Sequence, residues 1–160
     1  MTSSTVSALP QQSEAARILN STRRDKAGVH PSIVLFGRFL FSLIFIMSAA
    51  GHFSKETIAY AAAQGVPLAS ITVPFSGIMA LLGGLSLLLG DRSKIGAWII
   101  ALFLIPVSLA MHKFWGVADP MMAKMQMAHF MKNVSILGSA LLVSQFGAGP
   151  WSLDGRGKLR

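Results

Sequence analysis

The chain alternates between long apolar runs and short polar connections. Four runs, at residues 32–51, 71–89, 95–111 and 128–146, approach the roughly 20 apolar residues that a membrane-spanning helix needs. A soluble helical bundle would carry a polar face on each helix, whereas residues 71–89 are apolar or small on every side. The pattern therefore predicts an all-α integral membrane protein, folded as a four-helix bundle.

Composition and charge agree with a membrane protein. Hydrophobic residues make up 52% of the 160 residues and charged residues only 12%, against roughly 25% in an average soluble domain. The net charge of +8 comes from residues that flank the apolar runs rather than from a basic stripe interleaved with aromatics. We therefore expect a lipid bilayer, and no nucleic acid, as partner. The chain has no cysteine, which excludes disulfides and Cys-ligated iron–sulfur clusters.

The basic residues also predict the orientation in the membrane. Nine lie before the first run, between the second and third, or after the fourth, and three lie in the other two connections. The positive-inside rule then places both termini in the cytoplasm. We expect a mobile polar cytoplasmic arm at residues 1–31, a four-span domain at 32–153 and a basic cytoplasmic tail at 154–160. The nine are Arg17, Arg23, Arg24, Lys26, Arg92, Lys94, Arg156, Lys158 and Arg160, and the three are Lys55, Lys113 and Lys124.

The two outer connections, 53–70 and 112–127, are longer than the turns usual in bundles. The first contains KETIAYAAAQG, which predicts a short helix that ends at Gly65. In the second, Asp119 is suited to the N-cap and Pro120 to the first position of a helix that can continue into the fourth span. We expect both short helices to lie on the outer membrane surface.

Polar residues gather at the predicted outer ends of the spans. His129, Lys132 and Asn133 are spaced i, i+3, i+4, which places them on one face of the fourth span. Together with His52 and His112 they predict a polar pocket, with Lys55 and Trp115 beside it. The alternative for Asn133 is a hydrogen bond that joins two helices, worth roughly 1 kcal/mol. The other residues can equally lie at the membrane interface without binding anything.

Two charged residues fall near the predicted inner ends. Arg38 lies about two turns inside the first span, and Asp154 follows the fourth. Charged groups at membrane depth are expensive and normally face protein or water. Arg38 can extend to the cytoplasmic headgroups, or it can form a structural pair with Asp154.

Three blocks of the sequence resemble the DoxX family of small four-helix membrane proteins. They are FGRFLFSLIFIMSAAGHFSK, GGLSLLLGDRSKIGAWIIALFLIPVSLAMHKFW and HFMKNVSILGSALLVSQFGAGPWSLD. The resemblance spans residues 36–154, and its most specific elements are H-F-x-K-N and the later W-S-L-D. The recurring family positions map onto Arg38, Lys55, His112, His129, Lys132 and Asn133.

The resemblance implies an association with membrane redox systems, since the related DoxD type is a subunit of a thiosulfate:quinone oxidoreductase. We therefore expect a bacterial-type inner-membrane subunit of a quinone-linked complex, not an enzyme by itself. Its outer pocket would bind a quinone or exchange protons, and its partners would be other integral redox subunits. The main alternative is a non-catalytic assembly subunit, with Gly77, Gly83 and Gly84 allowing close helix approach.

A metal or haem site is a lesser alternative. His52, His112 and His129 come from three predicted helices on the same side of the membrane. Three histidines can bind Zn or Cu, and two can bind a b-type haem. The nearby lysines would repel a cation, and the sequence has no tight ligand spacing such as H-x-x-x-H.

Overall fold

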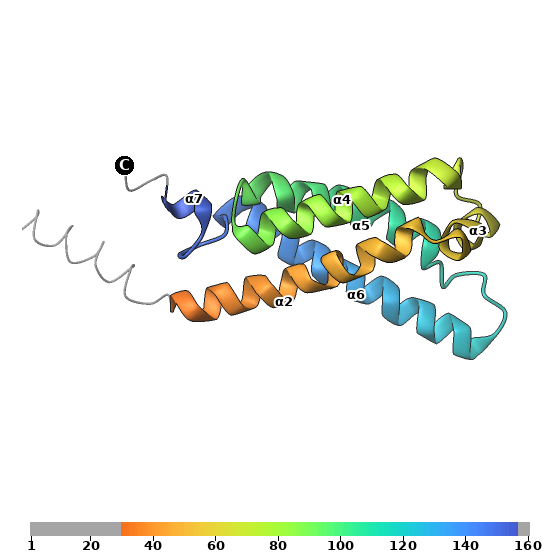
Figure 1. Cartoon of the computed structure of the whole chain (residues 1–160). Helices are drawn as coiled ribbons and strands as arrows, with labels where there is room; N and C mark the ends of the chain where they lie inside the picture. Colours follow the sequence, from red (N-terminus) through yellow and green to blue (C-terminus); the bar gives the residue numbers. More distant parts are fainter. Residues whose placement is uncertain (1–29, 157–160) are drawn as a thin grey trace, which may run out of the picture.

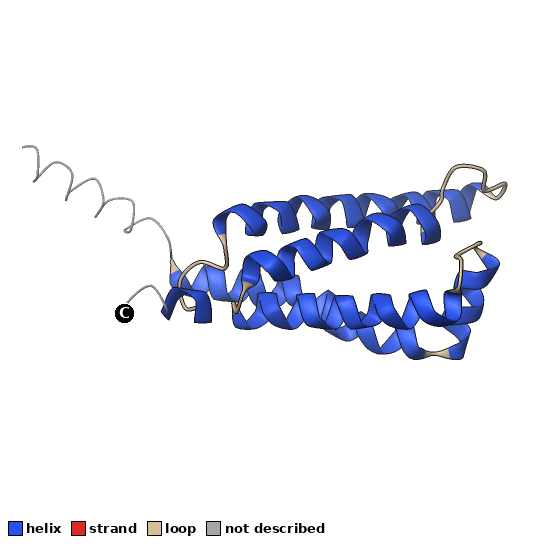
Figure 2. Cartoon of the chain, turned by 90° about the horizontal axis from the view of Figure 1, so that it is seen from above, coloured by secondary structure: helices blue, strands red, loops and turns tan. Residues whose placement is uncertain are grey.

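The computed structural model of the chain describes residues 30–156, and every regular element within that range is a helix (Figures 1 and 2). Most of the predicted N-terminal arm and of the basic tail lies outside the described residues. The elements are α2 (Pro31–Ala49), the 3₁₀ turn η1 (Ala50–Phe53), α3 (Lys55–Ala63), α4 (Ala69–Leu89), α5 (Ser93–Met111), α6 (Pro120–Phe146) and α7 (Leu153–Arg156).

Three of these segments are long and apolar enough to cross a membrane: Pro31–Phe53, Ala69–Leu89 and Ser93–Met111. They correspond to the first three predicted spans, so the described part is an all-helical, multi-pass membrane protein. Helix α6, which contains the fourth predicted span, is longer than these three segments but less apolar, and it is not among the segments apolar enough to cross a membrane. Its first half carries Lys124, Gln126, His129 and Lys132, which lower its mean hydropathy.

The four long helices pack in chain order, with α4 between α2 and α5, and α6 against α5. Glycines allow α4 to approach both neighbours closely. A Cβ atom on Gly83 would lie 2.7 Å from the side chain of Ile100 in α5, and one on Gly84 would lie 3.1 Å from Phe45 in α2. These small residues are therefore used within the chain and are not left on its surface to dock another protein. Ile100 and Phe45 are both part of the main buried core cluster.

Local signals set the short helices as predicted. Helix α3 begins after Ser54, whose hydroxyl accepts a hydrogen bond from the Thr57 amide, and the chain turns at Gly65 with a φ of 84°. Helix α6 begins with Asp119 as N-cap and Pro120 at its first position, and it continues without a break to Phe146. The Asp119 carboxylate accepts a hydrogen bond of 2.7 Å from the Met122 amide.

The segment after α6 folds back over the connection between α4 and α5. The amide of Asp154 donates to the carbonyl of Gly90, at 2.8 Å. Gly90 has a φ of 65°, and a Cβ atom there would lie only 2.5 Å from that of Ser152. This end of the bundle, here named the Arg38 end, is therefore closed by the chain's own C-terminal segment. The opposite end, near α3, is named the histidine end.

Candidate functional site

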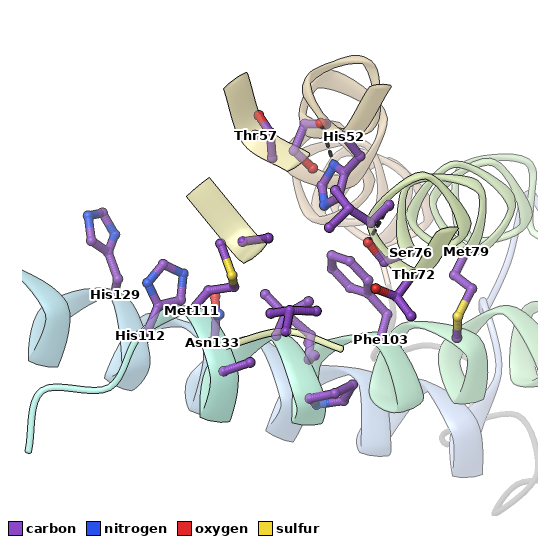
Figure 3. Close-up of a pocket in the computed structure, with 18 of the residues that line it drawn as sticks. His52, Thr57, Thr72, Ser76, Met79, Phe103, Met111, His112, His129 and Asn133 are labelled. Atoms are coloured by element: carbon purple, nitrogen blue, oxygen red, sulfur yellow. Dashed lines mark hydrogen bonds between the residues drawn. The ribbon is translucent and has the colours of Figure 1, made fainter. Parts of the chain in front are cut away.

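A cavity of about 620 Å³ lies at the histidine end, and all four long helices together with η1 and α3 contribute to its walls (Figure 3). Five of the seven residues predicted from the sequence to form a polar pocket line it. They are His52, His112, His129, Lys132 and Asn133. The structure thus brings together residues that are up to 81 positions apart in the chain.

Two histidines stack at one side of this cavity. The ring centroids of His112, at the end of α5, and His129, in α6, are 5.2 Å apart and their planes differ by 31°. The Nδ1 atom of His112 lies 2.9 Å from the Oε1 atom of Gln126. Since an amide oxygen only accepts hydrogen bonds, this contact assigns the hydrogen to Nδ1 and leaves Nε2 of neutral His112 as an acceptor.

One turn further along α6, Lys132 and Asn133 continue the same face of the helix. Asn133 is only 6% exposed and lines the cavity, and the hydrogen bonds of residues 30–156 leave its side-chain amide without a partner. Most buried polar groups are hydrogen-bonded to protein or to water. The polar atoms of Asn133 are not sealed off, since among the described residues the only fully buried side-chain nitrogen or oxygen without a partner is Nε of Arg38. The amide of Asn133 is therefore open to the cavity and can bond to water or to a ligand there.

His52 lies across the cavity from the stacked pair of His112 and His129, beside Phe103 and Ser76 (Figure 3). Its Nδ1 atom donates to the carbonyl of Ser48 at 2.9 Å, and its ring centroid is 5.7 Å from that of Phe103. Gly77 makes room for His52, because a Cβ atom there would lie 2.6 Å from the Cβ of the histidine. This histidine is held apart from the stacked pair.

Two of the predicted residues do not line the cavity. Lys55 is exposed at the start of α3, and Trp115 is 50% exposed in the α5–α6 connection. The Trp115 ring packs edge-on against Phe114 and Phe130, with centroid distances of 5.1 and 5.9 Å. Nearby, Lys113 donates a hydrogen bond of 3.1 Å to the carbonyl of Gln64.

The structure adds polar residues that the sequence did not indicate. The hydroxyls of Thr57 and Tyr60 come from α3, those of Thr72 and Ser76 come from α4, and the amide of Gln126 comes from α6. None of them stood out in the sequence. Isolated hydroxyls in an apolar helix usually bond to its own backbone, as Ser76 does to the Val73 carbonyl.

The three histidines do not form a metal centre in this structure. Within residues 30–156, no group of three or more His, Cys, Asp or Glu side chains is placed to hold an ion. His52 is separated from the pair, and the exposed ammonium of Lys132 lies on the same helical face as His129. The arrangement of these side chains therefore does not fit a metal ion bound by all three histidines.

At the Arg38 end, the charged residues are bound to the backbone. Arg38 is only 7% exposed, so its side chain lies within the protein. Its guanidinium donates to the carbonyls of Leu88, Ala148 and Trp151 at 3.1 to 3.2 Å. These three bonds join α2, the end of α4 and the segment after α6.

Asp154 lies at the same junction and caps α5. Its carboxylate accepts from the backbone amides of Arg92 and Ser93, at 2.8 and 2.9 Å, and from the Ser93 hydroxyl at 2.6 Å. Arg38 and Asp154 therefore lie at the same junction, where Arg38 binds the end of α4 and Asp154 binds the start of α5.

Comparison with known proteins decides the family. The DoxX family model matches residues 33–113, which is half of the chain. The chain belongs to the DoxX family. This DoxX protein is also similar to "Inner membrane protein YphA" of Escherichia coli (strain K12), with 27% identity over 134 residues, covering 82% of the chain and 95% of that relative. No solved structure matches it. The family match ends at Lys113, so the cavity-lining face of α6 lies beyond it.

Proposed function

We propose that this DoxX protein spans the bacterial inner membrane four times, with both termini in the cytoplasm. Helix α6 has 27 residues and is therefore about 40 Å long, which exceeds the roughly 30 Å of hydrocarbon. Its polar first turns can lie outside the bilayer while residues 128–146 cross it. The distribution of Lys and Arg supports the orientation, and the name of the E. coli relative supports the location.

We propose further that the cavity binds the head group of a membrane quinone. The observation that carries this proposal is the Asn133 amide, which opens onto the cavity and has no hydrogen-bond partner among the described residues. A quinone head needs an apolar slot and a hydrogen-bond donor near each of its two carbonyls. The cavity supplies both, since Phe103 and Val107 form apolar wall and Asn133 and Lys132 carry donors.

The histidines suit the reduced form of the same ligand. The hydrogen bond to Gln126 leaves Nε2 of His112 as an acceptor, so this nitrogen can accept a hydrogen bond from a quinol hydroxyl. Histidine also exchanges protons near neutral pH. His129, stacked on His112, extends this polar surface along α6. These residues would bind the head group and move its protons.

Electron transfer requires more than these side chains. The chain has no cysteine and so cannot hold a Cys-ligated iron–sulfur cluster. We propose that another integral subunit supplies electrons and that this chain holds the quinone within a larger redox complex. A purely assembling role is less well supported, because the glycines of α4 are used in packing against α2 and α5.

Binding of decylubiquinone to the purified protein in lipid nanodiscs tests the proposal. We expect His129→Ala and Lys132→Met each to weaken binding about tenfold, as for the loss of one charged or buried hydrogen bond. The matched controls are His30→Ala, at the start of α2, and Lys55→Met, which does not line the cavity. Unchanged dissociation constants in both cavity variants, with the helical circular dichroism intact, would contradict quinone binding and favour the assembly role.

A further inference from the structure

Some of the helices that line the cavity do not pack against each other; α2 and α6 are one such pair, and α3 and α6 are another. Helices α2 and α6 both line it, yet the main helix contacts are α2 with α4, α4 with α5, and α5 with α6. In Figure 1, α2 and α6 diverge toward the histidine end. The part of the cavity wall between the second half of α2 and the first half of α6, where the two helices do not pack against each other, is here named the α2–α6 gap.

Two hydrogen bonds join other elements around the cavity. His112 in α5 bonds to Gln126 in α6, and Lys113 bonds to the carbonyl of Gln64 at the end of α3. The Arg38 end is closed by the C-terminal segment. Between α2 and α6 themselves, the described residues form no hydrogen bond. Neither main packing contacts nor hydrogen bonds therefore hold α2 and α6 together.

The α2–α6 gap faces lipid. Ile44 and Ser48 line the cavity from α2, and Ile136 lines it from α6. Beside them on α2, Leu40 and Met47 are 51% and 71% exposed. Since α2 is apolar enough to span a membrane, its exposed side chains contact acyl chains. A gap between α2 and α6 therefore opens sideways into the bilayer.

We propose that the ligand reaches the cavity from within the membrane, through this α2–α6 gap. The occupant is an amphiphile dissolved in the bilayer: its polar head lies at the His112–His129 pair and its apolar tail lies in the gap. The identity of the head group depends on the proposed function, in which the ligand is a quinone. The route depends only on the helix packing. A ligand that arrives from water would instead enter at the α3 side of the cavity, where Lys113 bonds to the carbonyl of Gln64.

A fluorescent reporter tests the route without any added ligand. In a background with Trp98, Trp115 and Trp151 changed to Phe, Phe103→Trp places one indole on the back wall of the cavity. Phosphatidylcholine brominated at mid-chain quenches a tryptophan that acyl chains can reach. We expect quenching of this reporter, and Met79→Trp is the second reporter if Phe103→Trp does not fold. Phe39→Trp, on the exposed side of α2, is the positive control.

Closing the gap should remove this quenching. Because the chain has no native cysteine, Ser48→Cys and Ile136→Cys can be joined by a thiol-reactive linker that contains a reducible bond. We expect the link to abolish quenching of the cavity reporter and to block exchange of decylubiquinone, and reduction to restore both. The Phe39→Trp control should be quenched with or without the link.

The outcomes separate the two proposals. A cavity reporter that is never quenched, or is quenched equally after linking, overturns the lateral route even if decylubiquinone binds. A reporter that is quenched only in the open protein, together with no binding of decylubiquinone, supports the route and overturns the quinone as ligand. In that case the acyl chains of the lipids themselves occupy the gap.

Discussion

Arg38→Met removes the hydrogen bonds that join three parts of the Arg38 end. The guanidinium donates three bonds to backbone carbonyls, and each bond from a charged donor is worth roughly 1.5–3 kcal/mol. Their sum overstates the effect, because methionine does not carry the desolvation cost of a buried charge. Breaking buried charged networks typically costs 3–5 kcal/mol, so we expect the free energy of unfolding to fall by about 4 kcal/mol. Arg38→Lys keeps the charge without the planar fork and should lose about half as much.

Unfolding by sodium dodecyl sulfate in mixed micelles, followed by circular dichroism, measures this difference. Phe39→Met is the matched control, because Phe39 is the next residue of α2 and is 44% exposed. Limited proteolysis should also cut residues 147–156 faster in Arg38→Met, since Ala148 and Trp151 lose their bonds to α2. If Arg38→Met and Phe39→Met unfold within about 0.5 kcal/mol of each other, the side chain does not hold this junction and reaches the headgroups instead.

Two further predictions use the same unfolding assay. Asp154→Ala should cost about 1–2 kcal/mol, because the carboxylate caps α5 through the Ser93 amide and hydroxyl. Asp154→Asn should lose about half as much, because its one remaining oxygen can accept from only one of the two sides that the carboxylate binds. Gly83→Ala should cost about 1–3 kcal/mol, because its Cβ would meet Ile100 at 2.7 Å. Gly138→Ala, with nothing within 4 Å of the new Cβ, should instead gain about 0.5–1 kcal/mol. Equal stabilities of the two alanine variants would refute the close packing of α4 on α5.

Local signals explain why most helices could be predicted. The first three predicted spans agree with α2, α4 and α5 to within a few residues, because apolar run length and flanking turns are local properties. Gly65, Asp119 and Pro120 likewise act within one helical turn of their own position. The start of α4 was less predictable: Leu68 adopts a left-handed conformation with a φ of 49°, which its residue type does not favour.

The closure of the Arg38 end could be predicted only in part. The sequence placed Arg38 and Asp154 in the same leaflet, and the structure brings them to one junction. The atoms that bind Arg38, however, are backbone carbonyls of Leu88, Ala148 and Trp151. A carbonyl has no signature in the amino-acid sequence. Its availability depends on how the segment after α6 folds back, which is a tertiary property.

The cavity, too, could be predicted from the sequence only in part. Helical spacing was sufficient to place His129, Lys132 and Asn133 on one face, because that pattern repeats within two turns. Spacing could not reveal that Lys55 faces away while Tyr60, five residues later, lines the cavity. The direction of α3 relative to the bundle depends on the turn at Ser54 and on the bond from Lys113 to Gln64.

The two ends of the molecule allow a direct comparison between polar residues that hold helices together and polar residues that face a cavity. At the Arg38 end, a buried guanidinium and a carboxylate are bound to the backbone of neighbouring segments, and no cavity is needed to accommodate them. At the histidine end, the amide of Asn133 has no partner among the described residues and opens onto about 620 Å³ of space. The Nε atom of Arg38 also lacks a partner, but it is fully buried and does not line the cavity. If Asn133 served only to join helices, its amide would bond to α2 or α5 as Arg38 bonds across its own junction. The contrast favours a site that is completed by a ligand, and the unpacked α2–α6 side favours the bilayer as its source.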